Sequence, residues 1–211
     1  MGYLSFISLS LVIAMATVQG SDGQQSKALS YTLLKLHTFK TETELCKKKF
    51  KDAGRYPQRQ NASLSFGLVP NCSNCEKLTV QQHLIRIHKV AKRFAKPLGF
   101  IYAFEIKRQE TEITNCVESV QLELLTLIGV TEMQIPRDSI SQHSSASMEA
   151  LKVKARKYLE KLAGNSGTQV LEEDVMKTVG ATLMKEMFLA AVVMQKSRLE
   201  IQNMVTSNNV F

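Results

Sequence analysis

The sequence predicts an all-α fold, a four-helix bundle with up-up-down-down topology. After residue 20, the apolar residues recur with a helical period along nearly the whole chain. The connections between the expected helices are long, then short, then long. Two long crossings allow two parallel helices to be followed by two antiparallel ones. We also expect a short extra helix within the third connection.

The first 20 residues have the composition of a signal peptide. Residues 4–18 carry no charge, and the small residue Gly20 suits signal-peptidase cleavage. This apolar run is shorter than the ~20 residues of a spanning helix. No later stretch is expected to be long and apolar enough to cross a bilayer. We therefore expect a secreted, extracellular protein without membrane insertion, in which residues 21–211 form one helical domain.

The first helix is expected over about residues 26–53, because Gly54 then supplies a stop signal. Residues 55–78 contain two prolines and no sustained period, which predicts the first long connection. Two glycosylation sequons lie in it, at Asn61 and Asn71. A sugar-bearing loop is typical of a secreted protein.

The second helix should begin after Thr79, which precedes Gln82 by the spacing of a capping box. Pro97 is expected to bend this helix, because its ring removes a backbone donor. A few polar residues around 108–111 form the tight second connection. The third helix is expected to end at Gly129. Its apolar stripe consists of Ile113, Val117, Val120, Leu124 and Leu127.

The third connection, residues 130–168, contains a short basic helix near residues 148–162. The last helix is expected over about residues 170–204, and the acids of its first turn suit the positive end of the helix dipole. Its core face should consist of Val175, Val179, Leu183, Met187, Ala190 and Met194.

A second apolar stripe on the last helix, formed by Met184, Phe188, Val192 and Leu199, lies away from the core face. Either the crossing loops cover this stripe, or it forms a receptor-binding patch with a polar rim. In the second case the binding residues are Lys185, Phe188, Val192, Gln195, Arg198 and Leu199.

Four cysteines in a secreted chain suggest two disulfides, with three possible pairings. In the up-up-down-down topology, Cys46 and Cys116 lie at the same pole, which favours this pair because distant Cα atoms cannot be bridged. Alternating helix directions would instead place Cys46 beside Cys72 and Cys75. In the favoured topology, Cys72 and Cys75 close on each other, or one of them bonds to a partner chain.

The chain contains no glycine-rich phosphate loop, nucleophile elbow or His-Glu-x-x-His motif, so neither an enzyme nor a cofactor is expected. His83 and His88 have a spacing found in zinc fingers. However, only seven residues separate Cys75 from His83, where zinc fingers have about a dozen. No metal site is expected.

The formal charge of +8 belongs entirely to the part after the leader. Basic clusters occur at residues 47–51, 86–96 and 152–161, without the interleaved aromatics of a nucleic-acid platform. No nucleic-acid partner is therefore expected. Heparan sulfate is the polyanion that a secreted basic protein meets first.

Residues 69–75, with the sequence Val-Pro-Asn-Cys-Ser-Asn-Cys, and the helix containing Leu-Ile-Arg-Ile-His-Lys from Leu84 resemble the cysteine-bearing loop and second helix of long-chain helical cytokines. Interleukin-6, granulocyte colony-stimulating factor and the interleukin-12 alpha-type chains are the similar members. The resemblance implies a ligand that brings cell-surface cytokine-receptor chains together, using the outer sides of its first and last helices for one receptor. Through the alpha-type chains, it also implies a disulfide-linked soluble receptor-like partner for Cys72 or Cys75.

Two alternatives stay open. A type I interferon-like cytokine also has extra helices and two disulfides, although the cysteine in the last helix that would support it is not present. A secreted helical carrier of a hydrophobic ligand would need an internal cavity.

Overall fold

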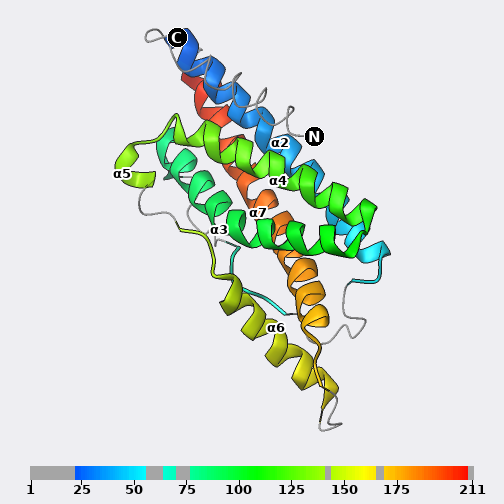
Figure 1. Ribbon diagram of the computed structural model, residues 1–211. Helices are drawn as coiled ribbons and strands as arrows, with labels where there is room; N and C mark the ends of the chain where they lie inside the picture. Colours follow the sequence, from blue (N-terminus) through cyan, green and yellow to red (C-terminus); the bar gives the residue numbers. More distant parts are fainter. Residues whose placement is uncertain (1–21, 56–63, 70–76, 141–143, 165–168, 209–211) are drawn as a thin grey trace.

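The computed structural model describes residues 22–55, 64–69, 77–140, 144–164 and 169–208. These ranges form six α-helices and contain no β-strand, which confirms the expected all-α class. The helices are α2 (Asp22–Asp52), α3 (Val80–Arg108), α4 (Thr111–Glu132), α5 (Arg137–Ile140), α6 (Met148–Ala163) and α7 (Glu172–Asn208) (Figure 1). The expected signal peptide, Asn61, Asn71, Cys72 and Cys75 lie outside the described residues.

The ends of the helices follow local sequence signals. The Thr79 side chain accepts a hydrogen bond from the backbone N–H of Gln82, and the Gln82 side chain accepts one from the Thr79 backbone, which confirms the capping box. Gly54 follows α2 in the left-handed region, with φ 67°. Gln109 ends α3 with φ 58°, and α4 begins two residues later, so the second connection is tight. Pro97 lies inside α3, which continues through it.

Helix α4 departs from two expectations. It continues through Gly129 to Glu132, because Val130 and Thr131 are buried and their packing outweighs the ~1 kcal/mol cost of a helical glycine. The helix is also long and apolar enough, by length and composition, to cross a bilayer, so the expectation that no later stretch qualifies was wrong. Its apolar stripe is buried in the core, as expected: Ile113, Val117, Val120, Leu124 and Leu127.

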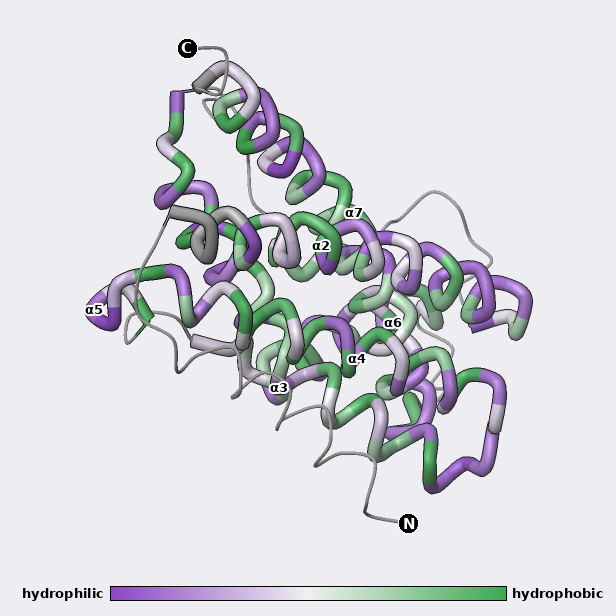
Figure 2. The backbone as a smooth tube through the Cα atoms, turned by 90° about the horizontal axis from the view of Figure 1, so that it is seen from above, coloured by the Kyte–Doolittle hydropathy of each residue, from purple (hydrophilic) through white to green (hydrophobic). Residues whose placement is uncertain are grey.

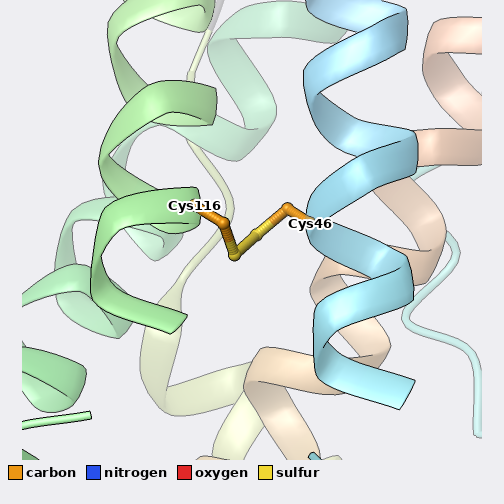
Figure 3. The surroundings of a disulfide bond; sticks show 2 residues. All are labelled: Cys46 and Cys116. Carbon is orange, nitrogen blue, oxygen red and sulfur yellow. A yellow bond between two sulfur atoms is a disulfide. The ribbon is translucent and has the colours of Figure 1, made fainter. Parts of the chain in front are cut away.

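Helix α2 packs against α4 and against α7. Late in α2, Cys46 is bonded to Cys116 early in α4, with their Cα atoms 5.1 Å apart (Figure 3). Early in α2, Thr32 accepts a hydrogen bond from Gln134, which follows α4. The two helices are therefore antiparallel, and the disulfide is the pairing that the sequence analysis favours.

Helix α7 runs antiparallel to α2. The Gln195 side chain, in the second half of α7, donates to the carbonyl oxygen of Leu36, in the first half of α2, at 2.7 Å. In the opposite halves, a Cβ built at Gly180 would lie 3.2 Å from the Phe50 ring.

Helix α3 also packs against α4 and α7, and it is antiparallel to both. Early in α3, His88 Nε2 lies 3.0 Å from Glu132 Oε1 at the end of α4. At the other end of α3, Arg108 forms ion pairs with Glu110 before α4 and with Glu173 in the first turn of α7. Polar and apolar residues alternate along the helices (Figure 2), as expected for helices with one buried side.

Seven consecutive residues of α7, 178–184, are buried, because α2, α3 and α6 all contact this helix. The expected core face of α7 is confirmed, since all six of its residues are buried. The largest fully buried side chains of the molecule are Phe39, Phe50, Phe94, Leu36, Ile87, Leu98, Ile101, Leu124, Leu127, Leu183, Met184 and Met187.

A buried carboxylate holds part of the first long connection against α7. Glu186 is 3% exposed, and its oxygens accept hydrogen bonds from the Ser65 hydroxyl and from the backbone N–H groups of residues 66–68, at 2.6 to 3.2 Å. Lys154 of α6 donates to the carbonyl oxygen of Phe66, and Arg93 of α3 donates to that of Leu68. Three helices therefore fix this segment.

Substituting Glu186→Ala should lower the free energy of unfolding by about 2 to 4 kcal/mol, because several buried donors lose their acceptor at ~1–3 kcal/mol each and partly recover it from water. Urea unfolding measures the change. The matched control is Glu160→Ala on the exposed side of α6, which should change stability by less than ~0.5 kcal/mol. Equal effects of the two substitutions would contradict this account of the segment.

The double variant Cys46→Ser/Cys116→Ser should lose about 4 kcal/mol of stability, since the bond closes a loop between residues 70 positions apart. Peptide mapping without reduction should recover Cys46 linked to Cys116. Recovery of Cys46 linked to Cys72 or Cys75 would mean that the helices are connected differently.

Candidate functional site

The outer side of the contact between α2 and α7 forms a surface that we call the α2–α7 seam. It consists of Lys47 on α2 and of Phe188, Val192, Gln195 and Leu199 on α7. The Lys47 ammonium lies 4.0 Å from the centroid of the Phe188 ring, which is the geometry of a cation–π contact. The hydrogen bond from Gln195 to the backbone of α2 places a second residue of the seam at the contact between the two helices.

The α7 residues of the seam share one side of the helix, because they are three or four positions apart. Phe188 and Val192 are half-buried, whereas Leu199 is 57% exposed. Phe188, Val192 and Leu199 therefore form an apolar strip along α7, and its exposure is greatest at Leu199. Such a strip with polar neighbours is typical of a protein-binding surface.

The structure brings together most of the residues predicted to bind a receptor. Two of them, Gln195 and Arg198, form hydrogen bonds within the molecule. Lys185 and Arg198 are half-buried beside the seam. Arg198 Nη1 donates to Gln195 Oε1 at 3.2 Å, and Gln195 in turn holds α2. Gln195 is thus a bridge between helices as well as a rim residue.

Met184, the first residue of the second stripe, is covered, as one of the two alternatives for that stripe expects. Its side chain is fully buried in the core. The reason is that α7 is enclosed by three helices in its first half, so a residue away from the main core face is still covered. The accessible strip begins one turn later, at Phe188.

Sequence reasoning missed several exposed leucines. Leu189 on α7 is 41% exposed, and Leu34 and Leu45 on α2 are 57% and 51% exposed. On α4, Leu122 and Leu125 are 55% and 51% exposed. These residues fall outside the core stripes, so a helical period alone does not select them. Only Leu122 has polar residues on both sides, Gln121 and Glu123, so the sequence offers little signal for the others.

An open hollow of about 470 Å³ lies at the other end of α7. Its charged side chains are engaged with one another: Arg55 pairs with Glu105 at 3.0 Å and with Glu110 at 2.5 Å. Burial raises the pKa of Glu105, against the influence of Arg55 and Arg108. The hydrogen bond from Arg108 lowers the pKa of Glu110. Apolar side chains, among them Leu159 and Val170, line the hollow beside these charges.

Neither histidine of the zinc-finger-like spacing is free to act as a surface ligand. His83 and His88 are both fully buried, and burial lowers the pKa of His83. His88 lies against Glu132. Among the residues that the structure describes, no group of three His, Cys, Asp or Glu side chains is arranged to hold a metal ion.

The chain was compared with models of protein families, with curated proteins and with solved structures, and none of them matches it. The assignment of a function therefore depends on the geometry of the helices and their surfaces.

Substituting Glu110→Gln should lower the free energy of unfolding at pH 7 by no more than about 1 kcal/mol, because the side chain is 36% exposed and water screens its ion pairs. The folded pKa lies below the ordinary value of 4.5, so this stabilisation is present above that pH and is lost as the pH falls through the folded value.

Urea unfolding at pH 7 and at pH 3 should thus show a difference between variant and wild type that shrinks with acid. The exposed Glu112 on α4 provides the control, Glu112→Gln. A difference of constant size at both pH values would exclude ionised Glu110 as its source.

Proposed function

We propose that this protein is a secreted helical cytokine that binds cell-surface cytokine-receptor chains and brings them together. The observation that carries the proposal is the α2–α7 seam, where the first and last long helices lie side by side and leave an apolar strip open to a partner. The resemblance of residues 69–75 and of the following helix to long-chain cytokines points the same way.

The finer fold that we propose is the up-up-down-down four-helix bundle formed by α2, α3, α4 and α7. Each of α2 and α3 packs antiparallel to both α4 and α7, and this pattern is expected when the first two helices point one way and the last two point the other. Helix α6 then belongs to the third connection, which crosses from α4 to α7.

Secretion of the chain is supported by two features. The disulfide between Cys46 and Cys116 joins two helices, and such bonds persist in oxidising compartments. The leader, residues 1–20, has the composition of a signal peptide. We extend the proposal to sugars on Asn61 and Asn71, and to a bond from Cys72 or Cys75 to a soluble receptor-like subunit.

Bringing two receptor chains together requires two separate surfaces. The α2–α7 seam is one, and the exposed pair Leu122 and Leu125 on α4 is the second that we propose. Helix α4 packs on α2 and α3, and α7 packs on the same two helices, so the two surfaces are carried by different members of the bundle. A ligand with this arrangement has room for one receptor at each surface.

The variant Leu199→Asp should reduce binding to the first receptor chain by about 30-fold, the effect of removing one hot-spot side chain worth ~2 kcal/mol. The side chain is 57% exposed, so the melting temperature should not change. The control is Leu171→Asp, with the same substitution at a residue that is 59% exposed and precedes α7. Labelled protein on cells that display single cytokine-receptor ectodomains provides the measurement.

Leu122→Asp tests the second surface with the same cells. It should leave binding to the first receptor chain unchanged and abolish signalling in cells that carry both chains. If Leu199→Asp and Leu171→Asp bound and signalled alike, the seam would not be a receptor-binding surface.

A further inference from the structure

Positive charge is highest on α3, and α6 adds to it. Helix α2 also has a net charge of +3, which the acids of α4 offset. Helix α3 contains seven Lys and Arg residues and a single acid, Glu105, which is buried and paired with Arg55. Helix α6 contains five Lys and Arg residues and two acids. The net charges of α3 and α6, +6 and +3, together exceed the +8 of the whole chain. The rest of the chain is therefore nearly neutral.

On α3 the cations form a row. Lys89, Arg93 and Lys96 lie four and three positions apart, so they share one side of the helix over ~10 Å of its length. Lys89 and Lys96 are exposed. Between Lys89 and Lys96, the apolar residues Val90, Ala91 and Phe94 are buried in the core. No aromatic side chain is exposed between Lys89 and Lys96, and the exposed ring of Phe100 lies one turn beyond Lys96 on the same side.

Helix α6 adds cations beside this row. Arg93 Nη1 lies 3.5 Å from the carbonyl oxygen of Leu68, and Lys154 Nζ lies 3.1 Å from that of Phe66. The carbonyl groups of Phe66 and Leu68 are two residues apart, a separation of at most ~7 Å along the chain. The guanidinium of Arg93 and the ammonium of Lys154 therefore lie within about 14 Å of each other. Lys157, one turn further along α6, is exposed on the same side as Lys154.

We propose that this surface, consisting of Lys89, Arg93 and Lys96 on α3 and Lys154 and Lys157 on α6, binds a sulfated polysaccharide. A row of cations along one side of a helix matches a linear polyanion with repeated charges, and binding releases the counterions of that polyanion. A protein partner would be held by aromatic anchors, and single-stranded nucleic acid by stacking on aromatic rings. Between the cations of the row the only aromatic is Phe94, which is buried, and the exposed Phe100 lies beyond the end of the row, so the row has no series of rings on which successive bases could stack.

The surface is distinct from the α2–α7 seam, so the binding itself does not rest on the proposed receptor function. Its biological meaning, retention on extracellular glycans, rests on secretion. Failure of receptor binding and failure of polysaccharide binding are therefore separate results.

The experiment compares two double variants of the full mature chain on heparin: Lys89→Ala/Lys96→Ala, and the control Lys48→Ala/Lys49→Ala. The control lysines are exposed on α2 in a second basic cluster, and both variants lose the same charge. Affinity is measured from 50 to 300 mM NaCl. The α3 variant should bind at least tenfold more weakly at 150 mM NaCl, with a salt slope shallower by about 2, one unit for each lost contact. The control should stay within twofold of wild type.

Lysine acetylation of the wild-type protein gives a second measurement that does not depend on the folding of a variant. Heparin should protect Lys89, Lys96 and Lys154 from acetylation, but not Lys48 or Lys49. Equal losses in both double variants, or protection confined to α2, would overturn the proposal. Tighter binding to duplex DNA, to chemically desulfated heparin or to anionic phosphatidylserine vesicles than to heparin at 150 mM NaCl would overturn it as well.

Discussion

The arrangement of the molecule depends on the burial of one apolar stripe of α2 against two helices at once. Leu36, Phe39 and Phe50 are at most 1% exposed, and each such burial contributes ~1.5–3 kcal/mol. Helix α4 covers the stripe from one side and is bonded to α2 through Cys46, whereas α7 covers it from the other. The α2–α7 seam exists because α2 must lie between these two neighbours.

The helices and their core faces could be predicted from the sequence because the signals that define them are local. The stripe of α4 is a periodic pattern within one segment, and the capping box at Thr79 involves residues three positions apart. The end of α4 was misplaced for the opposite reason. Whether Gly129 stops the helix depends on the burial of Val130 and Thr131, which is decided by the packing of other helices. The short helix α5 carries no periodic pattern, since it is only four residues long.

The polar contacts that fix the loops and the site could not be predicted. Glu186 lies on a largely apolar helix, and the donors that satisfy it are found 118 to 121 positions away in the chain. The seam shows the same limit. Its α7 residues share one side of the helix, which their spacing indicates, but Lys47 over Phe188 and the bond from Gln195 to α2 join segments that only the fold brings together. Periodicity specifies which residues share a side of a helix, and it contains no information on what that side meets.

The distribution of charge separates the α2–α7 seam from the cationic surface on α3 and α6. Lys47 of the seam lies over the Phe188 ring, and Arg198 beside the seam is bonded to Gln195. Helix α3 itself contains no acid from Val80 to Phe104, and Glu132 of α4 pairs with Lys92 rather than with a cation of the row. The screening length at physiological ionic strength is ~8 Å. A polyanion bound to α3 therefore has little electrostatic influence on contacts made at the α2–α7 seam. Capture by a sulfated glycan and engagement of a receptor are therefore compatible in one molecule. The strength of the first depends on salt, and that of the second depends mainly on apolar burial.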